Sequence, residues 1–167
     1  MTWLTHGTFA YLTASLLGIN PYIAVVGSTA PDWLEDTLGV KEHRGPTHYL
    51  ILWVGAFLLS LLLVGIKPVH TLGVQLLAFT YGGLTHLLLD SLTISGIPLG
   101  VGKTRIRIGG LIRTGKLSEW VFLALTFAVL FPLVHSGASL GFGTARELYE
   151  KGIIDLKEYR ELRFHLW

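Results

Sequence analysis

Three long apolar runs constrain this chain more than any other feature of its sequence. They cover residues 48–66, 69–92 and 118–134. Each approaches the ~20 apolar residues that a helix needs to cross a ~30 Å hydrocarbon core. Only 14% of the 167 residues are charged, against roughly 25% in soluble domains. We therefore predict an all-α integral membrane protein with three spanning helices.

A fourth apolar stretch, residues 7–30, is interrupted by Asn20-Pro21. Proline lacks an N–H donor and disfavours helical geometry at the residue before it. Two structures are compatible with this pattern. Either one kinked helix crosses the membrane, or two half-length helices form a re-entrant hairpin that returns to the same face.

Two further segments complete the predicted fold. Residues 105–113 alternate around Gly109-Gly110, which favours a short β-hairpin loop. Residues 138–167 predict a small tail of amphipathic helices, similar to short C-terminal oligomerisation motifs of bacterial proteins, so a homo-oligomer stays open. We divide the chain into a membrane-embedded domain, 1–137, and this soluble tail.

Composition limits the chemistry. Cysteine is absent, so a metal would be bound by His, Asp or Glu, as zinc and other first-row divalent ions allow. The formal net charge of +2 gives no reason to expect nucleic acid as a partner. The first residues lack the basic segment that begins a signal peptide.

The predicted topology gathers polar residues on one membrane face. If 48–66 crosses and 69–92 returns, His48 and Asp90 end on the same side. Four more residues flank these helices on that side: Asp32, Asp36, His43 and Glu119. Ionisable groups in or beside the membrane are costly and indicate function. Three other histidines lie away from this group: His70, His135 and His165.

Local spacing supports metal binding without proving it. His86 and Asp90 are four residues apart and project from one helix face, so they can bind one ion or form a structural hydrogen bond. His43 and His48 flank a Gly-Pro turn that can direct both rings inward. His6 reaches the same face only if residues 7–30 form the hairpin.

Taken together, these motifs resemble a known family. The order is His6, Pro31-Asp32, His43-Arg-Gly-Pro-Thr-His48, Gly83-Leu-Thr-His86-Leu-Leu-Leu-Asp90, Gly96-Ile-Pro-Leu99 and Glu119. It resembles the YdjM-like family of predicted inner-membrane metal-dependent hydrolases over roughly residues 6–125. The order of ligands is also similar to the zinc site of the phospholipase C and P1 nuclease superfamily.

The second resemblance implies specific ligands. By that analogy Asp32, His43, His86 and Asp90 hold one zinc ion, and Asp90 bridges to a second that His6 also binds. The implied cofactor is one or two Zn²⁺ ions, with Mn²⁺ as the alternative. Two differences are evident: Leu34 stands where a second acid is common, and Glu119 is the one acidic candidate after the His86–Asp90 motif.

The remaining polar residues suggest roles in hydrolysis. A carboxylate would act as base beside the metal-activated water, with Glu119 as first candidate and Asp36 as second. His48 would be a ligand or would protonate the leaving group. Four arginines, Arg44, Arg105, Arg107 and Arg113, could hold phosphate oxygens or be ordinary loop charge.

We therefore predict a multi-pass protein of the plasma or inner membrane that hydrolyses a phosphoester, with an anionic lipid or lipid-linked phosphate as substrate. The alternatives are a metal-binding or transport protein without catalysis, a membrane scaffold and an intramembrane protease. The last lacks the expected H-E-x-x-H motif. Lys and Arg counts favour a cytoplasmic site, but substrate-binding arginines would distort them, so the membrane face is left open.

Overall fold

The computed structural model describes residues 1–39, 44–101, 104–136, 152 and 155–157. Its elements are α1 (Trp3–Leu17), α2 (Pro21–Thr37), the 3₁₀ turn η1 (Pro46–His48), α3 (Leu50–Val64), the 3₁₀ turn η2 (Lys67–Val69), α4 (His70–Ser91), β1 (Ile97–Pro98), β2 (Arg105–Ile106) and α5 (Leu117–His135). The predicted mostly helical fold is confirmed. Almost all of the predicted tail, 138–167, lies outside the described residues.

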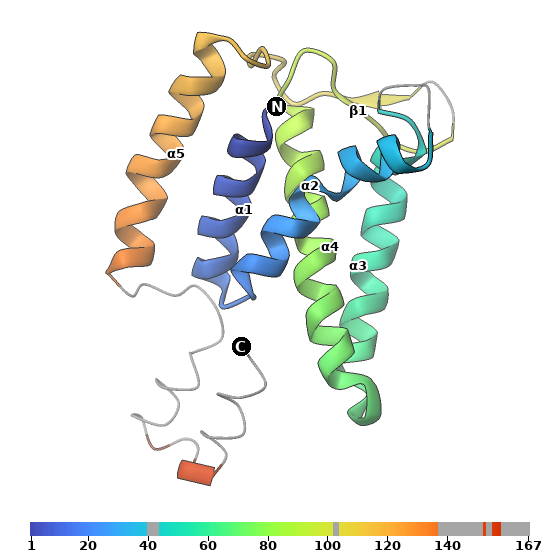
Figure 1. The fold of residues 1–167 in the computed structure, drawn as a ribbon, viewed down its shortest axis with the longest axis vertical. Helices are drawn as coiled ribbons and strands as arrows, with labels where there is room; N and C mark the ends of the chain where they lie inside the picture. The colour runs from blue at the N-terminus through green and yellow to red at the C-terminus, as the bar shows by residue number, and fades with distance from the viewer. Residues whose placement is uncertain (40–43, 102–103, 137–151, 153–154, 158–167) are drawn as a thin grey trace.

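The helices lie side by side, and the loops that carry the strands gather at one end of the molecule (Figure 1). The start of α1, the end of α4 and the start of α5 all lie at this end, which we call the site end. Helix α4 is central and packs against α1, α2 and α3, whereas α5 packs against α1. Polar residues of α1, α2 and α4 can therefore meet inside the molecule.

Residues 7–30 form a helical hairpin. Gly18 ends α1 in the left-handed conformation with φ 69°, which glycine adopts without strain. The Asn20 side chain then accepts hydrogen bonds from the backbone N–H groups of Tyr22 and Ile23, and Pro21 is the first residue of α2. Helix α2 returns toward the end at which α1 begins (Figure 1). The hairpin alternative is therefore the one that the structure shows.

The lengths of the helices make two of the three predicted spans candidate membrane helices. Within the described residues, the segments Lys67–Ser91 and Leu117–His135 are long and apolar enough to cross a membrane. Helix α3 is apolar but has 15 residues, or roughly 22 Å at ~1.5 Å per residue. This is shorter than a ~30 Å hydrocarbon core, so the third span is not confirmed.

A small antiparallel hairpin is present, but its strands differ from the prediction. Strand β2 pairs with β1, with Ile97 opposite Ile106, instead of pairing across Gly109-Gly110. The reason lies in the end of α4, whose last carbonyl groups need donors. The backbone N–H of Ile108 bonds Ser91 O at 2.8 Å, and that of Ile112 bonds Leu92 O at 3.4 Å. Residues 108–112 are thereby held along α4.

Candidate metal centre

Helix α4 presents two buried polar side chains to the interior near the site end. His86 is fully buried and the Asp90 carboxylate is almost so. Their spacing of four residues places them on one face, with His86 Nε2 3.6 Å from Asp90 Oδ2. The predicted pairing of these two residues on one helix face is confirmed.

Two other elements bring side chains close to His86 Nε2. His48 comes from η1 and Asp32 from the second half of α2. His48 Nε2 lies 3.3 Å from His86 Nε2. Asp32 Oδ1 lies 3.3 Å from His48 Nε2 and 3.6 Å from His86 Nε2. Three donor atoms from three elements thus form a nearly equilateral triangle, which we call the zinc triangle after the ion with whose geometry we compare it.

The dimensions of the zinc triangle fit a tetrahedral ion. Zinc binds His nitrogen and carboxylate oxygen at ~2.0–2.1 Å, and the edge of a tetrahedron is about 1.6 times the bond length, or roughly 3.3 Å. The three edges measure 3.3, 3.3 and 3.6 Å. Without an ion, His48 can donate to either neighbour, so geometry alone also allows a hydrogen-bonded network.

The outer nitrogens of both histidines have the partners that metal-bound histidines usually have. His86 Nδ1 lies 2.7 Å from the Ser28 carbonyl oxygen, which can only accept, so this nitrogen carries the hydrogen. The lone pair of a neutral His86 is then on Nε2, inside the triangle. His48 Nδ1 lies 3.5 Å from Glu35 Oε2 and 3.1 Å from Thr47 Oγ1. Such contacts orient ligand rings in metal sites.

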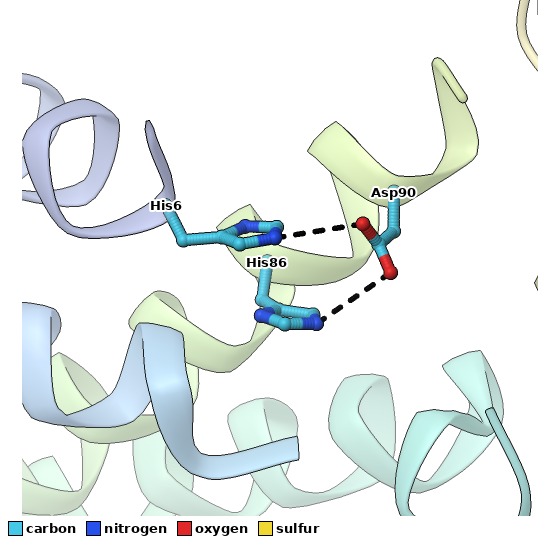
Figure 2. Close-up of side chains that lie close together, drawn as sticks. All are labelled: His6, His86 and Asp90. Carbon is cyan, nitrogen blue, oxygen red and sulfur yellow. Dashed lines mark ion pairs between the residues drawn. The ribbon is translucent and has the colours of Figure 1, made fainter. Parts of the chain in front are cut away.

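His6 forms a second possible ligand group with the same α4 residues. Its ring stacks on the His86 ring with centroids 3.8 Å apart, and both rings face Asp90 (Figure 2). His6 Nε2 lies 3.5 Å from Asp90 Oδ1, but neither of its fully buried ring nitrogens makes a hydrogen bond. Both groups, His6–His86–Asp90 and Asp32–His48–His86, require His86. Since His86 Nε2 has one lone pair, it can serve one ion at a time.

Asp90 is balanced by a positive group at each of its two oxygens. Arg44 NH2 lies 2.8 Å from Asp90 Oδ2, and the Met1 amino nitrogen lies 2.7 Å from Oδ1. Arg44 NH1 also donates to Thr93 Oγ1 and to the Gly96 carbonyl. Its backbone has φ 62°, which is uncommon for a residue other than glycine. The buried guanidinium therefore fixes Asp90.

Burial and neighbouring charges keep Asp32 ionised and His6 neutral. Burial raises the pKa of Asp32, but the His48 hydrogen bond and the charges of His86 and His48 outweigh it and lower the pKa to about 2. Burial lowers the pKa of His6 below 6.5, by more than Asp90 raises it. An ionised carboxylate and a neutral imidazole are the states that bind metals.

The sequence model of the YdjM inner membrane protein family matches residues 1–142. The chain belongs to this family. The match includes every residue of the centre described above. No curated protein and no solved structure matches the chain. The similarity to the phospholipase C and P1 nuclease superfamily stays a hypothesis.

In this member of the YdjM family, Glu119 lies apart from the zinc triangle. Its Oε1 accepts hydrogen bonds from Thr2 N at 2.6 Å, Thr2 Oγ1 at 2.9 Å and Thr5 Oγ1 at 2.7 Å, and its Oε2 accepts one from Gly115 N at 2.6 Å. Four donors fill most of the acceptor capacity of a carboxylate. Glu119 thus joins the start of α5 to the start of α1.

The two acids after Asp32 point in different directions. Asp36 is exposed, whereas Glu35 is buried and contacts the ring of His48. The buried residues of α2 include Ala24, Ser28, Pro31 and Glu35, which follow the spacing of one helix face. That spacing is the signal by which the sequence could have distinguished Glu35 from Asp36.

The other predicted site residues lie at the margin or outside the described residues. Arg105, Arg107 and Arg113 are exposed on the site-end loops, where Arg105 NH1 bonds Ser95 O. His43 lies outside the described residues, and so does His165. His70 bonds Val64 O at the start of α4, and His135 stacks on Phe131 at the end of α5. Both lie at the end opposite the site, as predicted.

Proposed function

We propose that this chain is a multi-pass membrane hydrolase that uses one divalent metal ion, zinc in the first place, to cleave a phosphoester. The observation that supports the proposal is the zinc triangle. Asp32 Oδ1, His48 Nε2 and His86 Nε2 come from three elements and have the spacing of three tetrahedral ligands. Catalytic zinc sites commonly combine three protein ligands with one position for water.

A zinc ion at this position would lower the pKa of a bound water toward ~7 and so supply hydroxide at neutral pH. The protein must then orient that water and accept its proton. We assign this task to Asp90 and His6. Asp90 Oδ2 lies 3.6 Å from His86 Nε2, and His6 Nε2 lies 3.5 Å from the other oxygen of the same carboxylate.

This assignment replaces Glu119 and Asp36 as candidates for the base. Glu119 already accepts four hydrogen bonds, and the exposed Asp36 side chain has no contact with the zinc triangle among the described residues. His48 becomes a ligand, and His43, which lies outside the described residues, stays a candidate. Arg44 becomes the residue that positions Asp90, since its guanidinium is buried and engaged.

The proposed substrate is an anionic phosphoester. Arg105, Arg107 and Arg113 are exposed at the site end and can bind phosphate oxygens there. Membership of an inner membrane protein family supports a position of this end at or near a bilayer surface. Asp32 is the partly exposed ligand, with 21% of its side chain accessible, so the substrate would approach from the α2 side.

A second candidate function is metal binding or transport without catalysis. The deep burial of His48 and His86 supports it, because a fully enclosed ion would leave no position for water. Hydrolysis distinguishes the two functions. A metal-loaded protein that does not cleave bis-p-nitrophenyl phosphate under conditions of full zinc occupancy would favour this alternative.

Metal content tests the proposal first. Elemental analysis of detergent-purified protein should give about one equivalent of zinc, because the two ligand groups share His86. His48→Ala and His86→Ala should lose this metal. His70→Ala is the matched control, since His70 lies at the opposite end of α4 and should leave the content unchanged. No stoichiometric metal after reconstitution with zinc or manganese would contradict the proposal.

The same preparations test the proton acceptor. His6→Gln should keep its zinc and lose turnover of bis-p-nitrophenyl phosphate by about 10²–10⁴-fold, the usual contribution of a general base. Loss of zinc in this variant would instead make His6 a ligand. Two equivalents of zinc in the wild type would contradict the single-ion centre.

A further inference from the structure

An apolar groove lies between α1 and α5, outside the zinc triangle. Its volume is about 440 Å³, within the range of ~300–1,000 Å³ typical of small-molecule sites. Leu4 and Thr8 line it from α1, and Trp120, Leu123 and Phe127 line it from α5. Apart from Thr8, these side chains are apolar, so the groove suits a hydrocarbon ligand.

The packing of α5 explains why the groove exists. At the site end Glu119 binds the start of α1, and farther along Phe122 packs against Phe9 with ring centroids 6.4 Å apart. Next to these contacts, the small residues Ala124 and Ala128 leave room between the helices. Helix α5 is long and apolar enough to cross a membrane and buries little of its surface. The groove therefore opens toward the hydrocarbon of the bilayer.

The groove begins near the site end, because Leu4 and Trp120 belong to the first turns of α1 and α5. Leu4 follows Trp3, whose indole N–H donates to Asp32 Oδ2 at 3.0 Å. On the other wall, Trp120 follows the anchoring Glu119. Lys116 precedes α5 and is exposed at the same end, with Arg113 close before it. A ligand with its tail in the groove would thus have its polar end beside cationic groups and a metal ligand.

We infer that this groove binds an acyl chain of the substrate, so that the phosphoester cleaved at the zinc triangle is that of a phospholipid. The inference rests on the proposed function and adds the substrate class. The apolar lining fits the chain, and the exposed Arg113 and Lys116 fit a phosphate. Trp3, which precedes the groove residue Leu4, contacts Asp32 of the centre.

Photolabelling tests the groove without relying on activity. The full-length protein would be placed in vesicles that contain phosphatidylglycerol with a photoreactive acyl chain, and the labelled peptides would be mapped by mass spectrometry. Labels should concentrate on the α1 and α5 peptides that line the groove. Ala124→Phe should remove them by filling the space. Ala56→Phe, on the exposed surface of α3, is the matched control.

Two labelling outcomes would overturn the inference. Equal labelling of α3 and α5 would show ordinary surrounding lipid, and cross-links between two copies of the chain through α5 would show that a second copy fills the groove.

In kinetics, Ala124→Phe should raise KM for phosphatidylglycerol about tenfold, the effect of losing roughly two buried methylene groups. Its turnover of bis-p-nitrophenyl phosphate should be unchanged, and an equal loss for both substrates would also contradict the groove.

The proposed function can fail separately. If the wild type cleaves neither substrate at full zinc occupancy, the hydrolase assignment is wrong whatever the labelling shows. If it cleaves the soluble phosphodiester but not phosphatidylglycerol, and the groove is not labelled, only the substrate assignment is wrong.

Discussion

Two buried carboxylates near the site end have different partners and therefore different tasks. Glu119 accepts hydrogen bonds from neutral donors of Thr2, Thr5 and Gly115, which belong to the segments that it joins. Asp90 instead contacts the guanidinium of Arg44 and faces the imidazole rings of the centre. Glu119 therefore holds two segments together, whereas Asp90 also faces the rings of His6 and His86 and lies where, in the proposed function, it can orient a water.

Substitution of Glu119 tests this difference. Glu119→Gln places an NH₂ group among donors, so we expect the free energy of unfolding to fall by about 1–3 kcal/mol. Zinc content and the turnover of bis-p-nitrophenyl phosphate per folded molecule should change little. Thermal unfolding in detergent and single-time-point assays on folded protein would measure the two effects. A loss of turnover by 10²-fold or more at unchanged stability would restore Glu119 as the base.

Asp36→Asn is the control for this experiment, because Asp36 is exposed and should tolerate loss of charge. It should leave stability, zinc and turnover as they are in the wild type.

The sequence predicted that most of these side chains would lie together, and it missed several of their contacts. His86 and Asp90 follow from helical spacing alone, and Asp32 and His48 follow from the topology. The sequence could not tell that Arg44 serves Asp90 and not a phosphate, because that depends on φ 62° at Arg44 and on the position of the Gly96 carbonyl. Neither is encoded by local spacing.

Among the elements, the contact of α2 with α4 matters most, since these helices carry Asp32 and His86. Gly27 and Gly82 allow it, because a Cβ at Gly82 would collide with the Ala24 carbonyl and one at Gly27 with the Phe79 carbonyl. Small residues bring helices close in this way in membranes. The Ser28 carbonyl that orients His86 lies on the same stretch of α2, so helix packing and ligand geometry are coupled.

We expect Gly82→Ala to lower the free energy of unfolding by about 1–3 kcal/mol through overpacking. It should also weaken zinc binding, because a shift of α2 moves Ser28 and Asp32 away from His86. Gly55→Ala in α3 is the matched control, since nothing lies within 4 Å of a Cβ there. Thermal unfolding and zinc titration of both variants would measure the effects. Normal zinc affinity in a destabilised Gly82→Ala would show that packing and site are independent.

Glycine, asparagine and proline were the residues that best predicted where helices end and begin. Asn20-Pro21 gave both possible structures for residues 7–30, and the hairpin follows once Gly18 is seen in the left-handed conformation. The pairing of 105–113 was wrong because the donors of Ile108 and Ile112 bind the end of α4. Hydrogen bonds to the end of α4 cannot be predicted from the alternation of residues within 105–113.

At the scale of the whole molecule, the site end is assembled by chain reversals. The α1–α2 hairpin returns Asp32 to the level of His6, and α3 and α4 return Asp90 to the level of His48. If α3 crosses the bilayer, its roughly 22 Å length requires local thinning or a small displacement of its ends. The number of spans therefore depends on whether η2 and the site end lie on the same side of the membrane or on opposite sides.

Single-cysteine labelling in vesicles would decide the topology, and the absence of native cysteine makes it direct. Trp3→Cys and Lys116→Cys introduce exposed thiols at the site end, and Lys67→Cys introduces one in η2. A membrane-impermeant maleimide should label the first two from one side and Lys67→Cys from the other. Labelling of Trp3→Cys and Lys67→Cys from one side and of Lys116→Cys from the other would contradict the hairpin, since one kinked span would separate residue 3 from the site end. Labelling of all three from one side would show that α3 and α4 enter the bilayer without crossing it, and the centre would then belong to a protein with α5 as its crossing helix.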